Sequence, residues 1–456
     1  MKHGIIPDMN DDYSDKNSRL GVLYPGHIEA LKARHDHALL KSGASHAVIF
    51  SGSPKVTFLD DMSYPFVANP HFLSWAPLGC LPLSYIVYTP GETPRLIYYQ
   101  PHDYWHVVPG DPVGYWAPHF DIRIVPSMDD IAALLPKDSD KCILIGEIDD
   151  AAHAFGIERV NPAMAVNILH FARGIKTEYE VECMRLASRR GARGHVAAEA
   201  AFRERASEFE IHRAYCHAVS HIDNELPYGN IVALNSHGAV LHYTNLDREP
   251  PDEMRSFLID AGARVCGYAS DITRTYSFND ARFAELIERM DAMQLEIVGK
   301  LRAGVDYREL HVDAHRMLGD VLVDTGLAHG DADTLLETGV TSAFFPHGLG
   351  HLIGVQVHDV GGHTQNESGT IIDPPSGHPF LRLTRVLEEN MTLTIEPGLY
   401  LIDMLLEDLR GTPAESHVDW NAVDWLRPFG GVRIEDDVRV TLDGCENLTR
   451  DAFAAI

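Results

Sequence analysis

Two aspartates in the segment FLIDAGARVCGYASDITRTY have the type and spacing that a metal site needs. Asp260 and Asp271 lie in two apolar, strand-like runs that flank a short polar turn. An antiparallel hairpin centred near Arg264 to Cys266 would place the two aspartates opposite each other, with their Cβ atoms roughly 5 Å apart. Facing carboxylates in a buried sheet repel each other unless cations lie between them. The alternative is that both side chains are exposed on their strands.

A glycine-rich segment, FFPHGLGHLIGVQVHDVGG, offers imidazole groups. His347 and His351 are four residues apart, but the glycines between them disfavour a helix and predict a loop whose backbone lies close to other groups. Neutral imidazole is a common metal ligand. His358 ends a short alternating run and could point into the same cavity. Because single histidines are usually packing residues, this segment alone defines no site.

Two glutamates complete the candidate set. Both lie in apolar, strand-like contexts, LTIEPGLY and GGVRIEDDVRV, where a glutamate is rarely buried without a partner. The set then has four carboxylates and one imidazole: Asp260, Asp271, His351, Glu396 and Glu435. These hard, oxygen-rich ligands suit Mn²⁺, with Co²⁺ or Zn²⁺ as substitutes.

The elements that position these residues fall into two parts. In the first, HAVIFSG, SYIVYTPG, PRLIYYQP and KCILIGEID predict strands, and IEALKARHDHALLKSG predicts a helix that ends at a glycine. A capping box of Thr177 and Glu180 then opens a long helix. We therefore predict a flexible tail at 1–19, an α/β domain at 20–172 and an α+β catalytic domain at 173–456.

The second part mixes helical and strand-like patterns. Helices are predicted for SEFEIHRAYCHAVSHI, ARFAELIERMDAMQLEIVGKL and YRELHVDAHRMLGDVLVDTG. Strands are predicted for NIVALN, AVLHYT, RSFLIDAGA and GYASDITRTYSF. The stretch from His363 to His378 is rich in Gly, Pro and Ser and predicts a surface loop.

Composition excludes several classes of function. The formal net charge of −28 makes nucleic acid and anionic membranes poor partners. No apolar run is long enough for a transmembrane helix, and the acidic start MKHGIIPDMNDDYSDKN does not resemble a secretory signal. Six cysteines without a CxxC pair favour reduced thiols in a cytoplasmic protein over a disulfide framework or a zinc–thiolate site.

The order D-x10-D, HGLGH, EPG and RIED resembles the M24 metallopeptidases, which include methionine aminopeptidase, aminopeptidase P and prolidase. The resemblance covers 176–456, and FLDDMSYPFVANPHFLSW extends it to the bacterial prolidases, the Xaa-Pro dipeptidases that include organophosphorus acid anhydrolase. It implies a pita-bread (creatinase/aminopeptidase-like) catalytic domain and hydrolysis of dipeptides with a C-terminal proline. It also implies a homodimer whose N-terminal domain acts as a pocket lid, and promiscuous hydrolysis of organophosphate triesters.

The same resemblance assigns metal ligands. Two divalent ions per subunit, expected to be Mn²⁺, would share Asp271 and Glu435. Asp260 would complete one ion, and His351 with Glu396 the other. Two ions about 3.5–4 Å apart can activate a water molecule and polarise the scissile carbonyl.

Catalytic and substrate-binding roles are also implied. Glu396 would move the water proton, His347 would bind the developing oxyanion or the scissile amide, and His358 would be a third catalytic group. The implied substrate-binding residues are His242, Arg382, Tyr228, Arg433 and Asp61. A bidentate arginine suits the proline carboxylate. Arg382 is the match for that role, and Arg385 and Arg433 are rivals that could instead form structural ion pairs.

Three assignments keep a simpler alternative. Thr273 would orient a bridging carboxylate. Tyr228 would line the pocket, or would simply be a turn aromatic. Asp61 and Trp75 would reach a neighbouring subunit's pocket, although Trp75 could instead pack within its own domain.

Two other functions share these motifs. Aminopeptidase P would have the same metal ligands but would accept longer peptides. A non-enzymatic binding module on the same fold would be expected to lack part of the ligand set, whereas all five ligand positions are filled here.

Overall fold

The computed structural model describes residues 18–147 and 155–456. Its contacts divide the chain into two compact units. The first unit contains Met1–Arg173, Thr177–Cys183 and Asn366–Thr370, and the second contains Gly174–Lys176, Met184–Gln365 and Ile371–Ile456. Of the predicted tail 1–19, residues 1–17 lie outside the described residues, whereas Ser18 and Arg19 already belong to the start of a helix.

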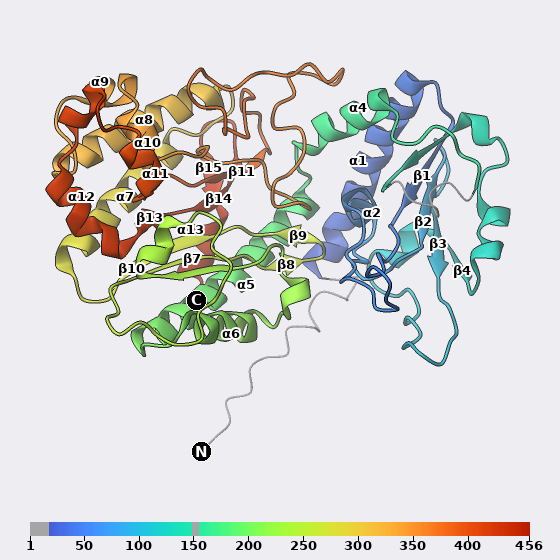
Figure 1. The fold of residues 1–456 in the computed structure, drawn as a ribbon. Coiled ribbons are helices and arrows are strands. Elements are labelled where there is room, and N and C mark those ends of the chain that lie inside the picture. The colour runs from blue at the N-terminus through green and yellow to red at the C-terminus, as the bar shows by residue number, and fades with distance from the viewer. Residues whose placement is uncertain (1–17, 148–154) are drawn as a thin grey trace. The chain divides into compact units, whose positions relative to one another are not determined.

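The first unit is built on one mixed sheet in the order β4-β3-β2-β1-β5 (Figure 1). Its strands are β1 (His46–Phe50), β2 (Tyr85–Tyr88), β3 (Arg95–Tyr99), β4 (Asp121–Val125) and β5 (Cys142–Ile145), and its helices are α1 (Arg19–Ser42), α2 (Pro70–Trp75) and α4 (Ala163–Arg173). The pairs β1–β5 and β3–β4 are parallel, and β1–β2 and β2–β3 are antiparallel. Helix α1 packs against α4 and ends at Gly43, whose left-handed φ of 63° suits glycine.

The second unit contains several short sheets between pairs of helices. Its strands are β6 (Ile231–Leu234), β7 (Ser256–Asp260), β8 (Arg264–Val265), β9 (Tyr268–Ala269), β10 (Thr273–Ser277), β11 (Thr392–Ile395), β12 (Gly398–Tyr400), β13 (Gly431–Arg433), β14 (Asp436–Val440) and β15 (Cys445–Asn447). The long helices are α5 (Glu178–Arg203), which belongs to this unit from Met184 onward, α6 (Glu208–Val219), α7 (Ala281–Gly299) and α8 (Tyr307–Asp324). The short helices are α9 (Ala332–Glu337), α10 (Val340–Phe344), α11 (Asp403–Glu407), α12 (Trp420–Leu426) and α13 (Leu448–Ala454). In Figure 1, β7 and β10 lie between α5 and α6 on one side and α7 and α8 on the other.

Two apolar cores hold these layers together. Side chains of α5 and α6, including Phe202 and Tyr215, pack against Phe257 and Ile259 of β7. A larger core joins α7 and α8 to β11, β12, β13 and β14. The strands that carry the candidate ligands are therefore covered by helices, which keeps their positions rigid.

Most predicted elements are confirmed, and one is wrong. The capping box is present, since Thr177 N donates to Glu180 Oε2 at 2.8 Å and Glu180 N donates to Thr177 Oγ1 at 3.3 Å. The predicted strand AVLHYT is absent, because a 3-10 helix covers Asn235–Ala239 and turns follow it. Asn235 adopts a left-handed φ of 57°, and its side chain accepts from Arg255 N at 2.8 Å, which ends β6 and turns the chain away.

A buried ion pair anchors the segment that follows the glycine-rich loop. Lys176 Nζ lies 3.0 Å from Asp359 Oδ2, and neither side chain is exposed to solvent. Gly354 leaves room for the pair, since a Cβ there would lie 2.6 Å from both Asp359 Oδ2 and Lys176 Cε. Among the described residues, none of the helices combines the length and apolar character that crossing a bilayer requires.

Candidate metal centre

The hairpin of β7 and β10 positions Asp260 and Asp271 at one end of its sheet. Asp260 pairs with Thr273, and the chain reverses at Cys266 and Gly267, whose φ values of 52° and 90° are typical of a two-residue turn. The predicted centre of the hairpin is therefore wrong by one residue. Asp271 is a diagonal neighbour of Asp260, not its direct partner, although both still belong to the same end of the hairpin.

His351 is held with one nitrogen directed at the carboxylates. Its backbone exchanges hydrogen bonds with Thr394, since His351 N donates to Thr394 Oγ1 at 3.2 Å and Thr394 N donates to His351 O at 2.9 Å. Its Nδ1 donates to the Leu352 carbonyl at 3.0 Å. This leaves Nε2 to face Asp271 Oδ2 at 3.4 Å and Glu396 Oε1 at 3.7 Å. Backbone hydrogen bonding of this kind fixes the tautomer that a metal-binding histidine needs.

The two glutamates enter the same place from different strands. Glu396 follows β11, and its N–H donates to the Leu349 carbonyl at 2.8 Å. Glu435 lies between β13 and β14 and forms a bridge with Thr273. The Thr273 hydroxyl donates to Glu435 Oε2 at 2.6 Å, as expected of a group that orients a carboxylate.

The electrostatics of this cluster fit a divalent cation. Burial raises the pKa of Glu396 to about 7 and that of Asp260 to about 6. Burial, together with the charges of Asp271 and Glu396, raises the pKa of Glu435 well above its ordinary value. For Asp271, burial acts in the same direction, but hydrogen bonding and charge from His351 outweigh it and leave the pKa lowered. Crowded carboxylates of this kind gain a stable charged form when a cation joins them.

Distances and unpaired atoms support the same conclusion. Ligand atoms of Asp271, His351 and Glu435 lie within 4.8 Å of one another. Asp260 Oδ1 is buried and has no hydrogen-bond partner, so that oxygen is open to a metal ion. Asp271, His351 and Glu435 therefore form a close group that could hold a metal ion, Glu396 lies beside His351, and Asp260 lies on the same hairpin as Asp271.

A chain of hydrogen bonds connects the ligands with His347. Arg433 Nη2 donates to Asp260 Oδ2 at 2.7 Å, and its Nη1 donates to the Tyr400 hydroxyl at 3.0 Å. His347 Nδ1 donates to the Gly348 carbonyl at 2.8 Å, so its Nε2 accepts from the Tyr400 hydroxyl at 2.7 Å. Burial lowers the pKa of His347 to about 3, which agrees with a neutral ring. Tyr400 was missed in the sequence because nothing distinguishes its spacing from that of a core aromatic.

The three predicted arginines have different surroundings. Arg433 is buried against Asp260, and Arg385 is buried with Glu388 at 2.6 Å. Arg382 is exposed and forms no ion pair with any residue in the described ranges. Of the three, Arg382 has the charge that is most available to a substrate carboxylate.

Two further histidines and one tyrosine lie beside the ligands. The His358 ring stands edge-on to His351 at 4.4 Å between centroids, and burial followed by the charges of His351 and Arg382 lowers the pKa of His358 to about 4. His242 is exposed, and its charge acts on His347 and His358. Tyr228 donates to Asp271 Oδ1 at 2.5 Å, so it contacts a candidate ligand directly and is not merely a turn aromatic.

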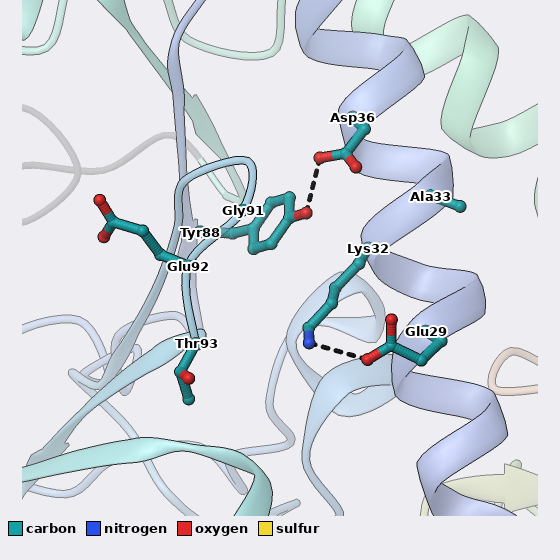
Figure 2. A pocket seen from close by; sticks show the side chains of 8 residues that line it. All are labelled: Glu29, Lys32, Ala33, Asp36, Tyr88, Gly91, Glu92 and Thr93. Carbon is teal, nitrogen blue, oxygen red and sulfur yellow. Dashed lines mark hydrogen bonds and ion pairs between the residues drawn. The ribbon is translucent and has the colours of Figure 1, made fainter.

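The two predicted residues of the first unit are described within that unit. Asp61 is exposed in a loop. Trp75 is fully buried, with its ring 4.8 Å from His35 and 5.4 Å from Tyr88, so the simpler alternative of packing within its own domain describes it. A pocket of about 370 Å³ in the same unit is lined by none of the predicted site residues (Figure 2). Hydrogen bonds join two pairs of its lining residues, Tyr88 with Asp36 and Lys32 with Glu29.

Gly350 is required by the close approach that seats His351. A Cβ at Gly350 would lie 2.1 Å from the Thr394 carbonyl oxygen and 2.6 Å from the Tyr307 hydroxyl. We expect Gly350→Ala to lower the free energy of unfolding by about 3 kcal/mol or more, because backbone atoms must move. Urea unfolding measures this loss. Gly299→Ala is the control, since a Cβ at Gly299 meets no atom within 4 Å, and equal midpoints for both variants would contradict the close approach.

Comparison with known proteins identifies relatives over most of the chain. The model of the "Xaa-Pro dipeptidase, N-terminal domain" family matches residues 22–171, and that of "Metallopeptidase family M24" matches residues 182–442. A Xaa-Pro dipeptidase of Xanthomonas axonopodis pv. citri is 51% identical over 437 residues, which cover 96% of this chain and 99% of the relative. One of Stenotrophomonas maltophilia is 52% identical over 436 residues, covering 95% and 98%.

Solved structures share the fold at lower identity. Aminopeptidase P from E. coli with the inhibitor Pro-Leu has a TM-score of 0.69 and 23% identity, and it covers 93% of this chain and 95% of that one. Proline aminopeptidase P II from Yersinia pestis has a TM-score of 0.66 and 25% identity, with 93% and 98% coverage.

Proposed function

Because the chain belongs to metallopeptidase family M24 and carries the N-terminal domain of Xaa-Pro dipeptidases, we propose that it hydrolyses dipeptides whose second residue is proline. The larger unit has the pita-bread fold of that family. One observation carries the proposal: relatives named Xaa-Pro dipeptidase are 51% identical over 96% of this chain and 99% of their own length. The five candidate ligands would hold the metal ions that a metallopeptidase needs.

Two divalent ions, with Mn²⁺ as our choice, would be held by the five ligands. Asp271 and Glu435 would be shared, Asp260 would complete one position, and His351 and Glu396 the other. When bound, such a pair supplies Lewis acidity and lowers the pKa of a water molecule. The Arg433 guanidinium holds one oxygen of Asp260, which leaves the other oxygen for a metal.

Proton transfer is assigned to Glu396. Its carboxylate lies 3.7 Å from His351 Nε2 and 3.7 Å from His347 Nδ1, and burial brings its pKa to about 7. From this position the carboxylate would take a proton from water and release it to the leaving amine. His347 Nε2 is hydrogen-bonded to the Tyr400 hydroxyl. To contact the substrate, this nitrogen would first have to give up that hydrogen bond.

Substrate length is set by the exposed cationic side of the site. Arg382, with His242 and His358, would bind the free carboxylate of the C-terminal proline, and Tyr228 would form the wall beside Asp271. A longer peptide has no carboxylate at that position and would lose this interaction.

The remaining parts of the proposal concern the assembly and the cell compartment. The boundaries 1–19, 20–172 and 173–456 remain our domain division. The chain would form a homodimer in which Asp61 contributes to a neighbouring pocket, as the family resemblance implies. The six cysteines are not joined in disulfides, which suits the reducing cytoplasm. Hydrolysis of organophosphate triesters is a side activity to be tested with Mn²⁺-loaded protein.

Aminopeptidase P activity is the second candidate, because the solved structures of that name share this fold. The deciding experiment measures proline release from Leu-Pro and cleavage before proline in Leu-Pro-Gly. Chelator-stripped protein is compared with the same protein after addition of Mn²⁺. We expect metal-dependent cleavage of the dipeptide alone. Faster cleavage of the tripeptide would assign aminopeptidase P activity, and no cleavage of either peptide with metal bound would reject both.

A further inference from the structure

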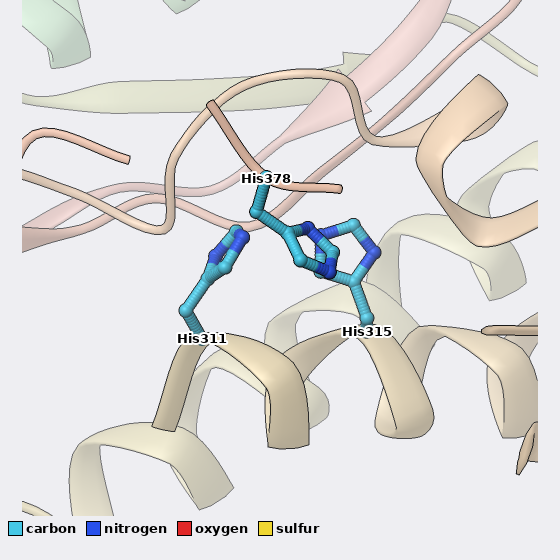
Figure 3. A group of neighbouring side chains, drawn as sticks. All are labelled: His311, His315 and His378. Carbon is cyan, nitrogen blue, oxygen red and sulfur yellow. The ribbon is translucent and has the colours of Figure 1, made fainter. Parts of the chain in front are cut away.

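Three histidines converge outside the five-ligand cluster (Figure 3). His311 and His315 are four residues apart on α8, so they lie on the same face, and His378 faces them from the loop that precedes Phe380. Their ring centroids are separated by 4.7 Å, 4.6 Å and 4.4 Å. One nitrogen of each ring lies within 4.8 Å of the others.

Two buried nitrogens of this group have no hydrogen-bond partner in the protein. His311 Nδ1 and His315 Nε2 are buried and have no hydrogen-bond partner. His315 Nδ1 lies 3.2 Å from Thr341 Oγ1, a contact that fixes the ring and leaves Nε2 open. An unpaired buried nitrogen costs free energy, so two in one place call for a ligand.

Aromatic packing explains the burial of these rings but not their open nitrogens. The Phe345 ring stacks on His315 at 4.8 Å and also contacts His311 at 5.9 Å. These contacts involve ring faces and edges and supply no hydrogen bond. Burial also lowers the pKa of His311 to about 3 and that of His315 to about 2, so both rings are neutral, which is the form that binds metals.

The surroundings select the kind of ion. The three-residue group contains only imidazole nitrogens and no carboxylate. Imidazole suits Zn²⁺ better than Mn²⁺ or Mg²⁺, which prefer oxygen. His378 is partly exposed, so solvent reaches the group and an ion can enter.

We propose that His311, His315 and His378 bind a Zn²⁺ ion, separate from the five-ligand centre. With Zn–N distances of about 2.0–2.1 Å, tetrahedral geometry brings the nitrogens to about 3.3 Å from one another, and water fills the fourth position. The nitrogens now lie within 4.8 Å of one another, so they must move closer together to bind the ion. His378 makes this movement because it lies on a loop, whereas the other two histidines are fixed on α8. The ion ties this loop to α8, and the inference holds whichever peptide the enzyme cleaves.

Zinc counting tests the site. Full-length protein, its His378→Ala variant and a His363→Ala control from the same loop are dialysed against equal free Zn²⁺ and counted by elemental mass spectrometry. We expect His378→Ala to hold about one Zn²⁺ fewer per chain than the other two proteins. An equal count in all three would overturn the proposal, since the histidines would then be a packing group.

A second background isolates the site from the five-ligand centre. Glu435→Gln weakens that centre without touching the histidines. We expect the Glu435→Gln protein to retain one Zn²⁺ ion and a Zn²⁺-dependent rise in Tm. Adding His378→Ala is expected to remove both the ion and the rise in Tm. Retention of both the ion and the rise in Tm by the double variant would place the ion elsewhere and overturn the proposal.

Discussion

Glu435→Gln is expected to lower kcat for Leu-Pro by about 10³-fold or more and to reduce the bound metal. A shared ligand contributes to both ions, and the Lewis acidity lost is worth several kcal/mol, at 1.36 kcal/mol for each tenfold change in rate. The metal-free variant is expected to be at least as stable as metal-free wild type. Glutamine retains an oxygen for the Thr273 hydroxyl and removes a charge that Asp271 and Glu396 repel.

The controls separate metal loss from misfolding. Glu389→Gln makes the same chemical change at an exposed position and is expected to leave kcat, metal content and unfolding midpoint unchanged. Steady-state kinetics, elemental analysis and urea unfolding of both variants provide the readouts. Wild-type kcat in fully folded Glu435→Gln protein would remove Glu435 from the ligand set.

Arg382→Met is expected to lower kcat/KM for Leu-Pro by about 10- to 100-fold, mainly through KM. A hydrogen bond to a charged group contributes about 1.5–3 kcal/mol, and methionine keeps the bulk of the side chain without its charge. Leu-Pro-amide lacks the carboxylate, so its hydrolysis is expected to be equal in the variant and the wild type. Comparison of the two substrates therefore measures the carboxylate interaction itself.

Arg302→Met is the matched control, because Arg302 is also exposed in the larger unit and forms no ion pair among the described residues. It is expected to leave both substrates unaffected. An equal loss on Leu-Pro and on its amide would show that Arg382 supports the fold of the site and does not bind the carboxylate. Arg433 or a main-chain donor would then be the next candidate.

Local signals account for the elements that were predicted correctly. Gly43 ends α1, and Thr177 with Glu180 begins α5, because capping depends on residues that are close in sequence. The strand AVLHYT failed because its apolar alternation was outweighed by Asn235, whose side chain bonds to residues about twenty positions away. Pattern alone contains no information on such a tertiary contact.

Residue type led to the prediction of the candidate ligands, but it did not give the exact register of the hairpin that carries two of them. The hairpin turns at Cys266 and Gly267, and sequence alone could not distinguish this from a turn one residue earlier. Tyr400 was missed because its role depends on Arg433, which lies on the neighbouring strand β13. Partners that come together only through folding leave no mark in local spacing.

The histidine group also combines a local sequence signal with a contact that forms only on folding. The four-residue spacing of His311 and His315 within a helical pattern was visible in YRELHVDAHRML. The third member, His378, comes from a loop whose path no periodicity predicts. A pair of histidines on a helix is usually part of the core, and only the folded position of His378 distinguishes this pair.

The Lys176–Asp359 pair has a consequence for the conditions under which the site keeps its shape. Ions in the medium weaken attraction between charges that solvent can reach. Both members of this pair are fully enclosed, and Asp359 directly follows His358. A high salt concentration would therefore screen the exposed charge of Arg382 but leave the Lys176–Asp359 pair intact. High salinity would weaken substrate binding without changing the fold of the segment that carries His358.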